Sequence, residues 1–134
     1  MFLILGLGNP GPRYELTRHN AGFLVLDNLA DKYKIKLTQH KYRSLYGKGE
    51  IEEFSVILAK PMTYMNESGK AVKALLSAFN LSSEQILVTH DDIDLPLGKI
   101  KIFSVLETQL GCLFYIPFLL TNYYLINQIS LSQK

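Results

Sequence analysis

The residue best suited to do chemistry in this chain is His19, which lies in the stretch Thr17-Arg18-His19-Asn20-Ala21-Gly22. Thr17 is a residue type that caps helices, and apolar residues follow it at helical spacing, so a helix is predicted from Arg18 to Tyr33. The exposed N–H groups and the positive dipole end of its first turn disfavour an imidazolium. His19 is therefore expected to be neutral at physiological pH and available as a general base.

Three polar residues elsewhere follow or precede predicted elements in ways that suit an active site. Asp91 and Asn9 each follow a short apolar run, and polar groups at the ends of strands collect at the active sites of open α/β sheets. Asn66 precedes a helical pattern and is expected to cap it. Together with His19 they would supply a base, a group that orients it and neutral donors. The structural alternatives are that Asn66 only caps a helix and that Asn9 only makes a turn.

The elements that must position these residues are predicted from apolar periodicity and turn signals. The predicted strands cover residues 2–6, 54–59, 86–88 and 99–102, and one more is expected within 34–48. In the second of these, Phe54, Val56 and Leu58 share a face. A second helix is predicted between Asn66 and Asn80. The order strand, helix, two strands, helix, strand, strand predicts an α/β domain with a mixed sheet.

Composition narrows the class of protein without deciding it. The 134 residues are 48% hydrophobic, which suits one domain with a real core, and the net charge of +2 permits a polyanionic partner without requiring one. The single cysteine, Cys112, excludes a disulfide framework and favours a reducing compartment. No signal or transit segment is visible, so a cytoplasmic location is expected. No His/Cys cluster has metal-ligand spacing, so no metal is expected.

A dinucleotide-binding fingerprint, Gly6-x-Gly8-x-x-Gly11, follows the first predicted strand. In that fingerprint the helix begins inside the glycine turn, so that its N–H groups face the pyrophosphate. Here Pro10 and Pro12 remove two donors, and the helical pattern begins only after Thr17. The fingerprint also needs an acidic residue after the second strand, and residues 34–49 contain none. A dinucleotide-binding protein is therefore the less favoured alternative.

Residues 1–102 resemble a bacterial-type peptidyl-tRNA hydrolase. The resemblance rests on four blocks in the same order: Gly6-Leu7-Gly8-Asn9-Pro10-Gly11 with Tyr14, Thr17-Arg18-His19-Asn20-Ala21-Gly22, Lys60-Pro61-Met62-Thr63-Tyr64-Met65-Asn66-Glu67-Ser68-Gly69, and His90-Asp91-Asp92-Ile93-Asp94-Leu95-Pro96. The family cleaves the ester that joins a peptide to tRNA. The resemblance implies a three-layer mixed-sheet α/β fold, a monomer, and neither metal nor cofactor.

The resemblance also implies roles for the polar residues named above. His19 would activate the attacking water, and Asp91 would hold and polarise the histidine. Asn9 and Asn66 would line the site and engage the peptide and the water. Ester hydrolysis needs no strong acid, because the ribose oxygen is a tolerable leaving group, so these residue types fit the reaction.

The resemblance implies that Tyr14 and Tyr64 contact the tRNA end and that Asn66 also binds the substrate. Either tyrosine can stack on an unpaired base, although packing is the alternative for Tyr14. Basic residues near the site blocks are expected to meet phosphates, and they are Arg13, Arg18, Lys60, Lys70 and Lys73. His40 and His90 are expected to be structural.

Residues 103–134 do not match the family. The family's Gly-Gly-His-Asn-Gly loop does not occur in this sequence, and residues 108–133 carry no charged side chain. We therefore expect an incomplete domain over 1–102, an apolar tail over 103–134, and as an alternative function a chain that binds tRNA without turnover. The stretch Leu110–Ile126 is interrupted by Gly111 and Pro117, so it is expected to pack on the sheet rather than cross a membrane.

Overall fold

A five-stranded sheet in the order β2-β3-β4-β1-β5 forms the centre of the fold. The computed structural model describes residues 1–15 and 20–90. The strands are β1 (Phe2–Gly6), β2 (Gln39–Lys41), β3 (Ser44–Ile51), β4 (Phe54–Pro61) and β5 (Ile86–Thr89). β1 is parallel to β4 and β5, whereas β2, β3 and β4 pair antiparallel, so the sheet is mixed as predicted.

The central strands β1 and β4 are buried on both faces of the sheet. In β4, Val56 and Leu58 belong to one apolar cluster, with Phe54 packed against it, whereas Ile57 and Ala59 belong to the other. The expected shared face is confirmed. Continuous apolar runs are typical of central parallel strands, because both faces are covered by helices.

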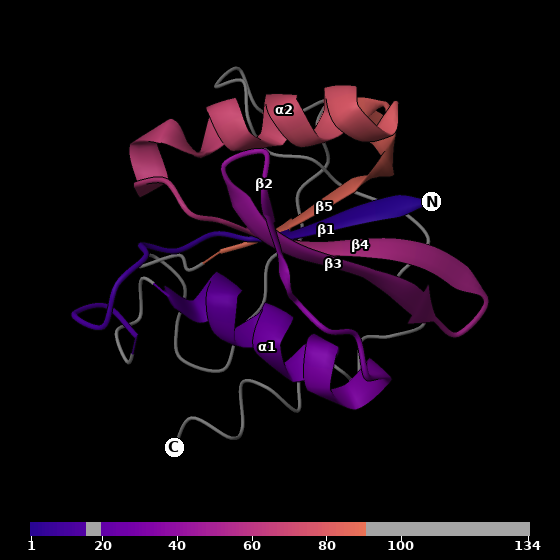
Figure 1. The fold of residues 1–134 in the computed structure, drawn as a ribbon, viewed down its shortest axis with the longest axis horizontal. Coiled ribbons are helices and arrows are strands. Elements are labelled where there is room, and N and C mark those ends of the chain that lie inside the picture. Colours follow the sequence, from indigo (N-terminus) through magenta and orange to yellow (C-terminus); the bar gives the residue numbers. More distant parts are fainter. Residues whose placement is uncertain (16–19, 91–134) are drawn as a thin grey trace.

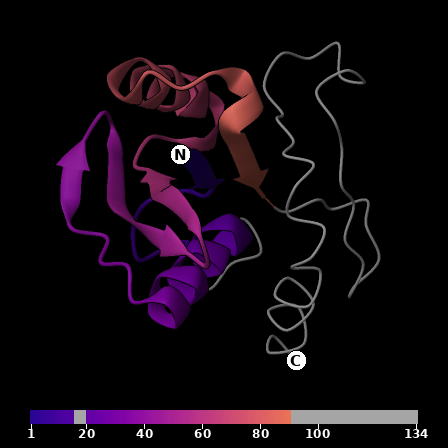
Figure 2. The ribbon, with the colours of Figure 1, turned by 90° about the vertical axis from the view of Figure 1, so that its right-hand side faces the viewer.

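Two helices cover the opposite faces of the sheet and give the domain its three layers, as Figures 1 and 2 show from two directions. α1 (Ala21–Tyr33) buries Leu26 in the apolar cluster that contains Leu58. α2 (Ser68–Phe79) buries Leu75 in the cluster on the other face. The three-layer α/β fold expected from the sequence is confirmed.

The stretch 34–48 contains more structure than its sequence indicates. It holds β2 and the start of β3, which form a hairpin through the turn residues Tyr42 and Arg43, so the prediction of one strand is wrong. All three residues of β2 are exposed, and an exposed edge strand has no apolar alternation to detect. In β3, Gly47 and Gly49 interrupt the alternation.

α1 begins later than predicted. Its first residue is Ala21 and its N-cap position is Asn20, so the expected start at Arg18 is wrong. Thr17, the expected cap, lies outside the described residues. Asn20 makes no side-chain cap hydrogen bond, because its amide bonds the backbone of Asn9 instead. A tertiary contact thus outweighs the local capping preference.

The start of α2 also differs from the prediction, whereas its end agrees. A 3-10 turn, η2 (Met65–Glu67), leads into the helix, and Glu67 occupies the N-cap position. Asn66 lies inside the turn, so its assignment as the cap of α2 is wrong. Asn80 ends the helix in the left-handed conformation, with φ of 50°, as expected for an Asn stop.

Several expectations fall on residues outside this description. The strand over 99–102, the tail over 103–134 and its apolar stretch Leu110–Ile126 lie there. Among residues 1–15 and 20–90, no helix combines the length and the hydropathy needed to span a bilayer.

The first turn of α1 packs directly on backbone at the ends of β1 and β5. A β carbon added at Gly22 would lie 2.4 Å from both the amide nitrogen of Leu7 and the carbonyl oxygen of Thr89. At Gly6, a β carbon would lie 2.1 Å from the carbonyl oxygen of Gly22. These approaches leave no space for a side chain, so the position of α1 depends on both glycines.

We therefore expect Gly22→Ala to lower the free energy of unfolding by at least the roughly 1–3 kcal/mol typical of overpacking, because backbone rather than a flexible side chain must move. Chemical denaturation of the full chain measures this. Ser77→Ala, on the exposed side of α2, serves as the control and should stay within about 0.5 kcal/mol of the parent chain. A Gly22→Ala chain as stable as the control would contradict the close approach.

Candidate active site

The carboxyl ends of three adjacent parallel strands meet at one edge of the sheet. β4, β1 and β5 lie side by side in that order. The Leu7 N–H donates to the Thr89 carbonyl at 2.9 Å, and Thr89 Oγ1 donates to the Leu5 carbonyl at 3.1 Å, so the ends of β1 and β5 are tied together. Ligand sites of open α/β sheets lie outside such carboxyl ends.

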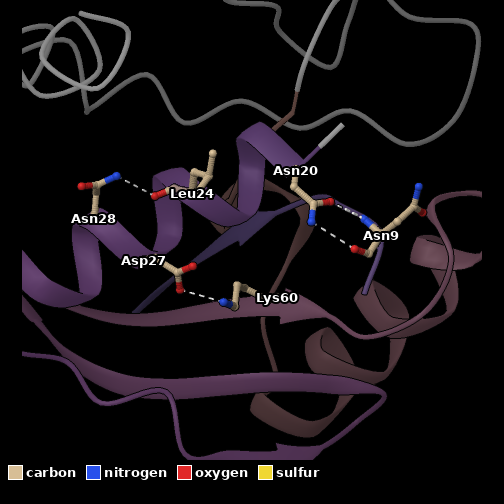
Figure 3. A network of polar contacts seen from close by, with 6 residues as sticks. All are labelled: Asn9, Asn20, Leu24, Asp27, Asn28 and Lys60. Atoms are coloured by element: carbon tan, nitrogen blue, oxygen red, sulfur yellow. Dashed lines mark hydrogen bonds and ion pairs between the residues drawn. The ribbon is translucent and has the colours of Figure 1, made fainter. Parts of the chain in front are cut away.

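Asn20 and Asn9 make the central contact at this edge (Figure 3). The Asn9 N–H donates to Asn20 Oδ1 at 2.8 Å, and Asn20 Nδ2 donates to the Asn9 carbonyl at 3.1 Å. Asn20 is only 3% exposed, so this carboxamide is a buried polar group with both of its ends in use. The start of α1 is thereby joined to the loop that follows β1.

The Asn9 side chain extends this connection to the segment after β4. Its Oδ1 accepts a hydrogen bond from the Met65 N–H at 3.1 Å, across 56 positions of sequence. Since Oδ1 is used in this way, the Nδ2 end of the amide is the donor that Asn9 can offer to a substrate. Among the described residues, Nδ2 donates to no acceptor.

The structure brings some of the predicted site residues together. Asn66 follows Met65 in η2 and is exposed, and Tyr64 precedes it with 65% of its surface exposed. Asn9, Asn66 and Tyr64 therefore lie in two adjoining segments. Tyr14 is half-buried in the loop after β1, where its N–H donates to the Gly11 carbonyl at 3.1 Å.

Two of the predicted site residues, His19 and Asp91, lie outside the described residues. Their roles as base and orienting group stay predictions. Asn20 is the site residue that the sequence did not single out. Its partner is 11 positions away in a proline-containing loop, so no periodicity links the two.

Lys60, one of the expected phosphate contacts, is paired and mostly covered in this structure. Its Nζ lies 2.7 Å from Asp27 Oδ1 and 5.3 Å from the centre of the Phe23 ring, and its side chain is only 14% exposed (Figure 3). This ion pair links β4 to α1. The pairing and the low exposure argue against the expected phosphate contact of Lys60, which stays a prediction.

Lys70 is also paired, but at the surface. It donates to Glu67 Oε1 at 2.6 Å, and the two side chains are 61% and 42% exposed. This hydrogen bond and the charge of Lys70 lower the pKa of the Glu67 carboxyl, and the charge of Arg43 lowers it further. Two cations, Lys70 and Arg43, therefore act on Glu67 in the turn that carries Asn66.

Two glycines of Gly6-x-Gly8-x-x-Gly11, Gly6 and Gly8, have a packing function in this structure, whereas Gly11 adopts a positive φ of 113° in the turn. A β carbon at Gly8 would lie 2.7 Å from Asn20 Oδ1, and Gly6 is closed off by Gly22. α1 begins at Ala21, far beyond the glycine turn, so its N–H groups do not start within that turn. Among residues 1–15 and 20–90, no group of three His, Cys, Asp or Glu side chains is placed to hold a metal ion.

The Asn20 amide pairs both the backbone N–H and the backbone carbonyl of Asn9. We therefore expect Asn20→Ala to lower the free energy of unfolding by about 1–3 kcal/mol, the cost of leaving buried polar groups unpaired. Urea denaturation measures this. Asn28→Ala is the matched control, since Asn28 is exposed on the same helix and its amide donates to the Leu24 carbonyl within it. Equal stability of the two variants would show that the Asn20 contact contributes nothing.

Known proteins of similar sequence and fold identify the family to which this chain belongs. A family model described as peptidyl-tRNA hydrolase matches residues 3–105. Peptidyl-tRNA hydrolases of Finegoldia magna and Carboxydothermus hydrogenoformans are 56% and 55% identical over 102 residues, covering 76% of this chain and 54% of each relative. The crystal structure of peptidyl-tRNA hydrolase from Acinetobacter baumannii shares 46% identity with a TM-score of 0.70, covering 73% of this chain and 50% of that one. The chain thus spans about half the length of the relatives it matches, and it belongs to the peptidyl-tRNA hydrolase family.

Proposed function

We propose that this chain hydrolyses the ester bond between peptide and tRNA in peptidyl-tRNA, with His19 as the general base. Membership of the family and the names of its relatives support the reaction class. Residues 1–102 would form the hydrolase-like part, and residues 103–134 would form a separate apolar tail. The activity would need no cofactor.

The observation that carries the proposal is the meeting of segments at the carboxyl edge of the sheet. Asn20, bonded to Asn9, directly follows His19 in the chain, and Thr89, in contact with Gly22, precedes Asp91 by two positions. Consecutive Cα atoms are about 3.8 Å apart, so these covalent links tie the proposed base and its proposed partner to anchors that pack on each other. This connection supports a His19–Asp91 pair beside Asn9.

In the proposed reaction, His19 accepts a proton from water as the water oxygen bonds the ester carbonyl carbon. Asp91 orients the imidazole and stabilises its charged form. Asn9 Nδ2 donates toward the oxyanion, since Met65 fixes its amide from the Oδ1 side. The bond to the ribose oxygen then breaks, and that oxygen takes up the proton held by the imidazolium.

The substrate proposed is peptidyl-tRNA, contacted by Tyr14, Tyr64 and Asn66. The 65% exposure of Tyr64 leaves its ring accessible to an unpaired base, and stacking of this kind is worth about 1–3 kcal/mol per base. We further propose that the chain acts as a cytoplasmic monomer.

A second candidate is a chain that binds tRNA without turning over substrate. The family model matches only residues 3–105, and no Gly-Gly-His-Asn-Gly motif occurs in this sequence. Turnover by the full chain distinguishes the two candidates.

For the hydrolase, His19→Ala should lower the turnover of an N-acylated aminoacyl-tRNA by about a hundredfold to ten-thousandfold, because the water loses its base. Asp91→Asn should lower it nearly as much, since the imidazole would be badly oriented. Release of the acylated amino acid from labelled substrate measures both.

His40→Ala is the control, because His40 is exposed on β2, which β3 and β4 separate from β1. It should keep the activity of the parent chain. Parent-like turnover by His19→Ala would refute the assignment of the base. A parent chain that binds tRNA but shows no turnover would favour the second candidate.

A further inference from the structure

The β2–β3 turn holds two consecutive non-glycine residues in the left-handed region. Tyr42 has φ of 55° and Arg43 has φ of 56°. A two-residue hairpin turn with positive φ at both positions favours Asn-Gly, because a β carbon is costly there. Bulky residues in this conformation persist only where their surroundings hold them.

Contacts on several sides hold this turn in place. The Tyr42 carbonyl accepts from Ser44 Oγ at 3.2 Å, and its ring lies 5.6 Å from the Phe79 ring, centre to centre. The Arg43 carbonyl accepts from the Met62 N–H at 2.8 Å. The packing of its ring against Phe79 explains why Tyr42 occupies this turn. The Arg43 side chain, in contrast, is exposed and makes no hydrogen bond or ion pair with the described residues.

The turn adjoins the segment after β4 that carries the site. Met62, bonded to Arg43, is 42% exposed, and Tyr64 is 65% exposed, so two large apolar side chains lie open on this segment. The Arg43 charge acts on Glu67, the neighbour of Asn66. Lys41, which precedes Tyr42 in the chain, is a second exposed cation, and its Nζ lies 5.1 Å from the centre of the Tyr42 ring.

We propose that Arg43 binds a phosphate of the RNA part of the substrate as it passes the β4 side of the site. A guanidinium offers planar, paired donors to phosphate oxygens, and the fixed backbone turn reduces the conformational freedom lost on binding. Exposed Tyr64 provides a stacking surface for a base beside that phosphate. The inference rests on the proposed function, because it assumes RNA at this edge.

The test is binding of the full chain to a fluorescein-labelled acceptor-stem minihelix of tRNA with an unpaired 3′ end, followed by anisotropy at several salt concentrations. Arg43→Gln should weaken binding about fivefold at low salt. It should also reduce the slope of log K against log salt by about 0.7–0.9, the value for one lost phosphate contact. Lys32→Gln is the matched control, since it removes one exposed cation from the last turn of α1. It should leave both quantities unchanged.

Arg43→Gly separates binding from stability. Glycine relieves the left-handed strain at this position, so this variant should unfold at a higher temperature than the parent chain. Its affinity for the minihelix should fall by the same factor as that of Arg43→Gln. Affinity equal to that of Lys32→Gln in either Arg43 variant would overturn the phosphate contact and leave the proposed function standing. A parent chain that fails to bind the minihelix would overturn the proposed function together with this inference.

Discussion

The side-chain amide of Asn20 is the interaction on which the arrangement of the site depends. Asn9 lies beyond the end of β1, where no neighbouring strand can pair its backbone, and one carboxamide supplies both the missing acceptor and the missing donor. A buried backbone group left unpaired costs more than a typical hydrogen bond contributes. The contact therefore fixes the loop after β1 relative to α1, and through the Asn9 side chain it also fixes the turn that carries Asn66.

A second constraint acts together with the first. Gly6 and Gly22 allow α1 to approach the strand ends at backbone distance, and the Lys60–Asp27 pair ties the same helix to β4. A rigid frame of this kind suits a reaction in which donors must already point to where charge develops. Close packing thus explains Gly6 and Gly8, the first two glycines that resemble a dinucleotide fingerprint, and the turn conformation explains Gly11.

The sequence predicts the central elements well and their junctions poorly. β1 and β4 are apolar runs whose burial can be inferred directly, and the left-handed stop at Asn80 follows from residue type. The helix starts were misplaced because Asn20 uses its side chain in a tertiary contact, and because the 3-10 turn over Met65–Glu67 precedes α2. The exposed strand β2 leaves no pattern that a sequence could reveal. For the site, the family blocks identify Asn9 and Asn66 as candidates, but only the fold shows that Asn20 holds the first beside the second.

The central claim is that the segments clamped by Asn20 form the surface that receives the tRNA end. The most direct measurement is a ¹⁵N amide titration of the full chain with a deacylated acceptor-stem minihelix. We expect the largest chemical-shift changes at the backbone amides of Asn9, Asn20 and the η2 residues Met65–Glu67. The amides at the C-terminal end of α1 should change little. Shift changes concentrated at the end of α1, or spread evenly over the domain, would contradict the claim.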